Sequence, residues 1–174
     1  MSEITHNKEN HPDTTTPFFA VSIPKLIVMS VCTFSLYDLY WFYKNWLSIK
    51  TRFSSDISPF WRAFFAFFYC YQCFSQINSF GQEENISGNF PASLLAIGWI
   101  VTMLMTHLPE PYFLVSTLAF IFVIPVQIYA NKINNKIAPA HYKNSNFSKW
   151  NWGAIVIGGA INLLVILTLF IPNT

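Results

Sequence analysis

The side chain most able to do chemistry in this sequence is Asp38, the one acidic residue inside a long apolar stretch. A carboxylate at the centre of a bilayer costs about 2.5–3.5 kcal/mol on insertion scales, so it needs a partner or water nearby. Arg62 and Lys44 are the cations that could supply one. The chemical interpretation is a proton or cation relay, and the structural one is an acid bonded to a tyrosine or paired with Arg62. The aromatic residues around Asp38 favour the structural interpretation.

A row of side-chain amides is the second polar feature inside an apolar segment. Gln127, Asn131 and Asn134 stand at i, i+4 and i+7, a spacing that places them on one face of a helix. Such amides can bond to a neighbouring helix, line a polar route, or bind lipid headgroups beside Lys132 and Lys136. We expect the first of these uses, a contact that fixes one helix against another.

Small residues repeat in the last apolar segment. Ala154, Gly158 and Asn162 follow one another at four-residue intervals, and Gly159 lies beside them. Small side chains at this spacing let helix backbones approach closely, and an asparagine can add an interhelical hydrogen bond. The pattern predicts a helix-packing face, used within the chain or in a homo-oligomer.

The motifs of enzymes and metal sites are weak or absent. Cys70 and Cys73 have the Cys-x-x-Cys spacing, but they lie within an aromatic segment, which favours inert packing over redox chemistry. His107 and Glu110 flank a proline turn, where an acid–base pair and ordinary solvation explain them equally. The sequence has no Gly-rich phosphate loop, no Gly-x-Ser-x-Gly and no His-Glu-x-x-His. We expect no catalytic residue, no metal, no cofactor and no enzymatic activity.

Composition defines the environment of these residues. Of 174 residues, 53% are hydrophobic and only 10% are charged, against roughly a quarter in typical soluble domains. The charged residues cluster between long apolar stretches, which implies a lipid bilayer as the surrounding medium. A net charge of +2 without a basic patch gives no indication of nucleic-acid binding.

The apolar stretches predict an all-α, polytopic helical membrane bundle. About four transmembrane helices are expected, near residues 25–46, 92–108, 112–130 and 152–171, with an aromatic interfacial or re-entrant helix near residues 59–77. Residues 1–17 are expected to be a flexible polar tail, and residues 18–174 a single helical membrane domain.

Two basic connectors set the expected topology. The connectors at residues 44–52 and 131–149 are both lysine-bearing and should face the cytoplasm. If every apolar stretch crossed the membrane, these connectors would lie on opposite sides of it. One of the stretches between them must therefore not cross the membrane. Residues 59–77, which include Arg62 near their start, are the expected exception. Four crossings place both termini outside the cytoplasm. The alternative is five transmembrane helices, because the preference of lysine and arginine for the cytoplasmic side is a tendency and not a strict rule.

Four sequence stretches carry a resemblance to a known family. They are TFSLYDLYWFYKNW at residues 33–46, IKTR at 49–52, PFWRAFFA at 59–66 and PVQIYANKINNKIAP at 125–139. The chain resembles a family of small bacterial membrane proteins, grouped as a domain of unknown function, with a Thr-Phe-Gly-Leu-Tyr-x-x-Tyr-Trp-like signature. Ser35 stands where that signature usually has glycine. The resemblance implies a multi-pass protein of the bacterial cytoplasmic (inner) membrane and supplies no reaction.

Two functions from different classes fit these features. The first is a non-enzymatic integral membrane accessory or scaffold protein, which engages the helices of another membrane protein or of a second copy of itself. The alternative is a small transporter or channel component. Its polar route would be built from intramembrane polar residues, namely Asp38, Arg62, Gln127, Asn131, Asn134 and Asn162. Convergence of these side chains favours transport, and dispersal favours the accessory role.

Overall fold

A computed structural model describes residues 16–110 and 112–168, and every regular element among them is a helix. The predicted all-α class is confirmed. The elements are α1 (Ile23–Cys32), α2 (Leu36–Phe53), α3 (Pro59–Phe64), α4 (Ala66–Glu83), α5 (Ala92–Leu104), η1 (Met105–His107), η2 (Tyr112–Leu118), α6 (Phe120–Ile137) and α7 (Lys149–Thr168), where η marks a 3₁₀ helix. The expected tail, residues 1–17, lies almost wholly outside the described residues.

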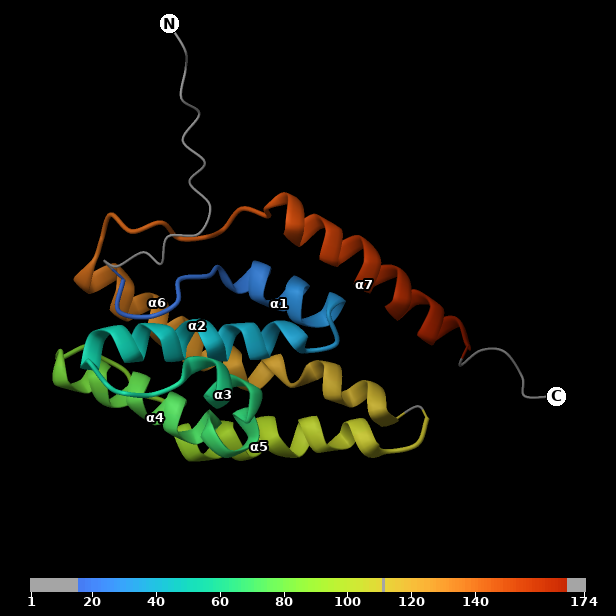
Figure 1. The fold of residues 1–174 in the computed structure, drawn as a ribbon, viewed down its shortest axis with the longest axis horizontal. Coiled ribbons are helices and arrows are strands. Elements are labelled where there is room, and N and C mark those ends of the chain that lie inside the picture. Colours follow the sequence, from blue (N-terminus) through green and yellow to red (C-terminus); the bar gives the residue numbers. More distant parts are fainter. Residues whose placement is uncertain (1–15, 111, 169–174) are drawn as a thin grey trace, which may run out of the picture.

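The first apolar stretch forms a helical hairpin, so the expectation of one helix over residues 25–46 is wrong. α1 and α2 run in opposite directions in Figure 1. Between them Phe34 and Ser35 adopt left-handed backbone conformations, with φ of 49° and 63°. The Ser35 amide donates to the Ser30 carbonyl at 2.8 Å, which closes the end of α1. The ten residues of α1 reach about 15 Å, half the thickness of a hydrocarbon core.

The aromatic segment expected as one interfacial helix at residues 59–77 is divided at Phe65 into α3 and α4. α3 exposes its rings, with Phe60, Trp61 and Phe64 all more than half exposed. α4 instead turns Phe74 into the bundle core, where it is fully buried. α4 is therefore packed on one side into the bundle, while its other side continues the exposed aromatic surface of α3 with Phe68 and Tyr71.

Two stretches among the described residues have the length and composition to cross a membrane. They are Tyr112–Ile137, with 26 residues, and Lys149–Thr168, with 20. They correspond to the spans expected at residues 112–130 and 152–171, although the first continues to Ile137 and residues 169–171 lie outside the described part. At residues 92–108, 13 residues of α5 and 3 of η1 reach about 24 Å, short of a hydrocarbon core of about 30 Å.

Aromatic rings from α2, α4 and α5 form the centre of the bundle. Phe42 stacks on Phe74 with 5.7 Å between ring centroids, and Trp99 meets Phe42 edge-on at 5.1 Å. Trp41 contacts both phenylalanine rings edge-on, and all four side chains are fully buried. Offset and edge-on ring contacts of this kind favour one arrangement of the three helices.

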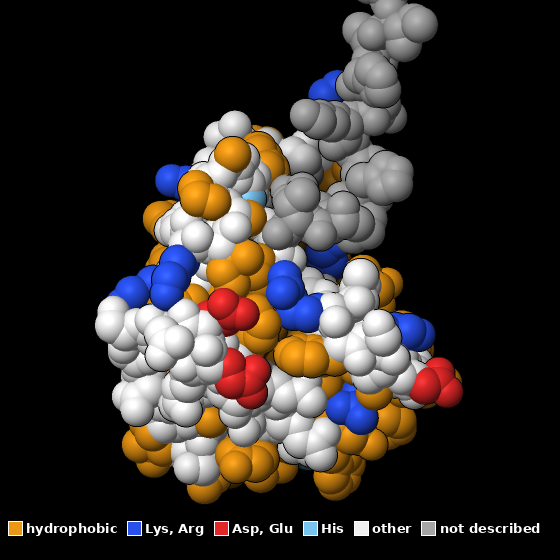
Figure 2. Space-filling view, turned by 90° about the vertical axis from the view of Figure 1, so that its left-hand side faces the viewer, with side chains coloured by type: hydrophobic (Ala, Val, Ile, Leu, Met, Phe, Trp, Pro, Cys, Tyr) orange, Lys and Arg blue, Asp and Glu red, His pale blue; other side chains and the backbone are white. Residues whose placement is uncertain are grey.

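Residues 44–52, expected as a basic connector, instead form the second half of α2, which finishes at the same end of the bundle as α4 and α6 (Figure 1). Arg52 lies over the Phe80 ring of α4, 4.8 Å from its centroid. Lys136 of α6 donates to the Glu84 carbonyl at 2.8 Å, where a cation is favourable because helix carbonyls end there. Figure 2 looks onto this end and shows lysine, arginine and acidic side chains among polar atoms. The expectation that both basic stretches face the cytoplasm stays a prediction.

Candidate functional site

The α6 amides hold the extended segment at residues 18–21, which precedes α1. This segment is not helical, so its backbone groups need partners from elsewhere. Asn134 accepts a hydrogen bond from the Phe18 amide and donates one to the Phe18 carbonyl, each at 3.0 Å. Asn131 donates to the Val21 carbonyl at 2.9 Å. The row of amides predicted from the sequence therefore fastens α6 to the start of the folded chain.

Gln127 joins the same network at a fully buried position. Its Nε2 donates to the Phe19 carbonyl at 3.1 Å and to Asn131 Oδ1 at 2.8 Å, and its Oε1 accepts a bond from Trp41 Nε1. Donor and acceptor are both used, so the amide is satisfied without water. Gln127 thus links α6, α2 and residues 18–21.

Asn45 completes this network, and the sequence analysis missed it. Its Oδ1 accepts a hydrogen bond from the Phe19 amide at 3.1 Å, and its Nδ2 donates to the Trp41 carbonyl at 3.0 Å. The sequence does contain a pattern that indicates a buried Asn45: it lies seven residues after Asp38, and this spacing places both side chains on one face of α2. We call Asn45, Gln127, Asn131 and Asn134 the amide clamp.

Asp38 lies in a separate polar contact at the α1–α2 turn. It is fully buried, and it accepts hydrogen bonds from Ser30 Oγ at 2.6 Å and from Trp99 Nε1 at 3.2 Å. Each carboxylate oxygen has one donor, which is how a buried acid is stabilised without a cation. The acid connects α1, α2 and α5. Within the described residues, its partners are neither a tyrosine nor the two cations proposed from the sequence.

Arg62 lies on α3, away from Asp38. Its guanidinium stacks over Trp46, 4.5 Å from the ring centroid, and over Tyr69 at 5.1 Å. One of its nitrogens donates to Gln72 Oε1 at 3.3 Å. Cation–π contacts of this geometry hold α3 against α2 and α4. The ion pair between Arg62 and Asp38 considered from the sequence does not form.

The small-residue face of α7 packs against α1. Gly158 makes the closest approach, since a Cβ at this position would lie 1.8 Å from the Cys32 carbonyl oxygen. Asn162 donates to the Val31 and Cys32 carbonyls at 3.3 and 3.4 Å, and Ala154 packs at the edge of the core. Gly159 differs, because a Cβ there would have nothing within 4 Å.

Cys70 and Cys73 are buried free thiols on the inner side of α4. Burial raises the pKa of the Cys70 thiol to about 11, and burial also raises the pKa of Cys73 well above its ordinary value. Both thiols stay protonated at neutral pH, so neither is a ready nucleophile. Among the residues that the structure describes, no three metal-ligating side chains gather in one place.

The polar residues singled out from the sequence thus occupy four separate places. The α6 amides lie against residues 18–21, Asp38 at the α1–α2 turn, Arg62 on the rings beside α3, and Asn162 at the α1–α7 contact. Each has a protein partner. Compared with protein-family models, curated proteins and solved structures, the chain has no match in any of the three. The family resemblance of residues 33–46 and 125–139 stays a prediction.

Proposed function

We propose that this chain is a non-enzymatic multi-pass membrane protein that binds a transmembrane helix of another membrane protein through the outer face of α7. The observation that carries the proposal is the packing of α7, which is long and apolar enough to cross a membrane but has no buried residue. In Figure 1, α7 lies at the side of the bundle, beside α1.

The outer face of α7 suits a second helix as well as lipid. Val156, Ile157 and Leu164 are each more than 60% exposed. Gly153 lies on the same side, where an added Cβ would have nothing within 4 Å, and Ala160 is exposed seven residues further on. Small residues seven positions apart recur on one side of a helix, where they allow a partner helix to approach closely. We call this surface, residues 153, 156, 157, 160 and 164, the outer face of α7.

The distribution of polar side chains supports an accessory role over transport. A polar route needs groups that face a common path and can exchange partners with ions or water. Here the buried amides and Asp38 already bond to the protein itself, and they lie at separate contacts between helices. The proposal also includes the bacterial cytoplasmic (inner) membrane as the location, in line with the family resemblance.

The test is site-specific photocrosslinking in living cells. A benzophenone amino acid at Val156 or Leu164 should give one discrete adduct with a second membrane protein. The matched control is the same amino acid at Leu94 of α5, which is as exposed and as apolar and should give no such adduct. An adduct with a second copy of this chain would assign the face to a homo-oligomer. Absence of any protein adduct from α7 would refute the proposal.

A flux measurement tests the transport alternative directly. Purified protein reconstituted into vesicles should show no ion flux above that of empty vesicles, and Asp38→Asn and Asn162→Leu should change nothing. Flux that these substitutions abolish would establish the transport function instead.

A further inference from the structure

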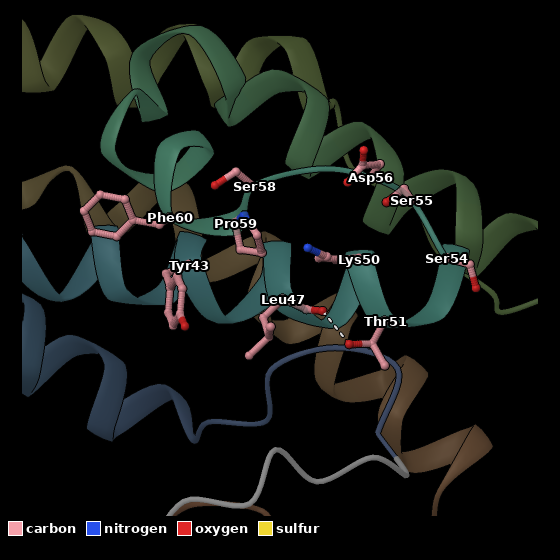
Figure 3. Close-up of a pocket in the computed structure, with 10 residues that line it drawn as sticks. All are labelled: Tyr43, Leu47, Lys50, Thr51, Ser54, Ser55, Asp56, Ser58, Pro59 and Phe60. Carbon is pink, nitrogen blue, oxygen red and sulfur yellow. Dashed lines mark hydrogen bonds between the residues drawn. The ribbon is translucent and has the colours of Figure 1, made fainter.

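A cavity of about 580 Å³ opens between α2 and the connector that leads from α2 to α3. Figure 3 shows the residues around it: Tyr43, Leu47 and Phe60 lie toward one end, and Ser54, Ser55 and Asp56 toward the other. Lys50 extends between the two groups. The cavity is therefore amphipathic along the direction of α2. Its polar end lies at the C-terminal end of α2, whose last turn carries Arg52.

The polar end has groups without partners in the described chain. Ser55 Oγ is shielded from solvent and has no hydrogen-bond partner. The charged groups of Lys50 and Asp56 both line the cavity, yet they form neither an ion pair nor a hydrogen bond with any described residue. Thr51 differs, because its hydroxyl donates to the Leu47 carbonyl at 3.0 Å. The Ser55 hydroxyl lies behind the cavity surface, so the groups open to a ligand at this end are the two opposite charges, which match a ligand with both an acceptor and a donor.

We propose that this cavity binds the phosphoethanolamine headgroup of a glycerophospholipid. The phosphate accepts hydrogen bonds from the Lys50 ammonium, which is a donor. The ethanolamine ammonium donates to the Asp56 carboxylate. The glycerol and the upper acyl chains lie along Tyr43, Leu47 and Phe60, the apolar end of the cavity.

The Asp56 carboxylate selects among headgroups. A purely anionic headgroup such as phosphoglycerol would place negative charge beside Asp56 without a positive charge to offset it. A phosphocholine headgroup carries a quaternary ammonium that has no N–H to donate to the carboxylate. Only a headgroup with both a phosphate and a primary ammonium meets Lys50 and Asp56 together.

The experiment uses the full chain in detergent and short-chain lipids as probes, with binding followed by native mass spectrometry. Dihexanoyl phosphatidylethanolamine should bind about tenfold more tightly than the phosphatidylglycerol and phosphatidylcholine of the same chain length. Lys50→Gln should weaken binding of all three lipids, because each has a phosphate. Asp56→Asn should remove the preference for ethanolamine and should strengthen phosphatidylglycerol binding.

Matched controls separate this site from a general charge effect. Lys143→Gln and Glu110→Gln remove one charge of each sign at described positions that do not line the cavity, and neither should change any of the three affinities. Circular dichroism checks that all four variants keep the helical content of the parent. Equal affinity of the parent for the three lipids would overturn the proposal. So would cavity variants that behave as the controls do.

Discussion

The contact between α7 and α1 depends on one missing side chain. A Cβ on Gly158 would lie 1.8 Å from the Cys32 carbonyl oxygen and 2.8 Å from its carbon, both backbone atoms that no rotamer change can move. Ordinary contact begins at 3.4 Å, so Gly158→Ala requires a displacement of at least 1.6 Å, the difference between the two distances. Asn162 already bonds to the Val31 and Cys32 carbonyls at 3.3 and 3.4 Å, so this displacement breaks both bonds.

The neighbouring glycine provides the matched control. Gly159→Ala adds the same methyl group one position away, where nothing lies within 4 Å. Both substitutions gain about 1 kcal/mol of helix propensity, so this gain cancels in the comparison. Overpacking costs about 1–3 kcal/mol and each lost hydrogen bond about 1 kcal/mol. With two bonds lost, we therefore expect Gly158→Ala to be less stable than Gly159→Ala by about 3–5 kcal/mol.

Two measurements check this prediction. Unfolding by sodium dodecyl sulfate in mixed micelles, followed by circular dichroism, gives the difference in the free energy of unfolding. Spin labels on exposed positions of α1 and α7, at Val28 and Leu163 in a Cys32→Ser background, report the separation of the helices. The distance should lengthen and broaden with Gly158→Ala and stay unchanged with Gly159→Ala. Equal stabilities and equal distances in the two variants would refute the assigned contact.

Three further predictions follow from the buried polar contacts and the thiols. Asp38→Leu removes both acceptors and leaves the buried Ser30 hydroxyl and Trp99 Nε1 without this partner, so it should lower the free energy of unfolding by about 1–3 kcal/mol in the same assay; unchanged stability would contradict the assigned bonds. Asn134→Leu should leave both backbone groups of Phe18 without partners and speed hydrogen exchange of its amide about tenfold or more. The adjacent, exposed Asn135→Leu is the control and should leave this exchange rate unchanged. In detergent at pH 7, maleimide should label the half-buried Cys32 before Cys70 and Cys73, which should react only after unfolding because burial keeps them protonated; fast reaction of all three thiols by mass spectrometry would count against the packing of α4.

Much of the amide clamp could be predicted from periodicity alone. Gln127, Asn131 and Asn134 share one helical face in any α6, so their common orientation follows from the backbone. Their partner could not be predicted, because residues 18–21 lie more than 100 residues away and contact the clamp through backbone atoms. Backbone groups carry no residue-specific signal, so a sequence shows which amides are available and not which carbonyls they meet.

The hairpin between α1 and α2 was hidden for a different reason. A hydropathy window sums over residues 25–46 and registers one apolar stretch, because neither Phe34 nor Ser35 resembles a typical helix breaker. The turn depends on their left-handed conformations, which cost L-residues about 1–2 kcal/mol each. Ser35 recovers part of this cost by donating to the Ser116 carbonyl at 3.2 Å. The glycine usual in the resembling signature would adopt the same conformation without that cost.

Two of the four stretches that carry the family resemblance lie against each other in the fold. Residues 33–46 supply Trp41 and Asn45, and residues 125–139 supply Gln127 and Asn134. Trp41 donates a hydrogen bond to Gln127. Asn45 and Asn134 accept hydrogen bonds from the backbone amides of Phe19 and Phe18, which are adjacent in the chain. The polar side chains of these two stretches therefore supply hydrogen bonds to the backbone of residues 18–21. Inside an apolar bundle, a backbone group without a hydrogen bond is costly. Residues that complete a fold in this way already use their donors and acceptors within the chain, which explains their residue types without a ligand.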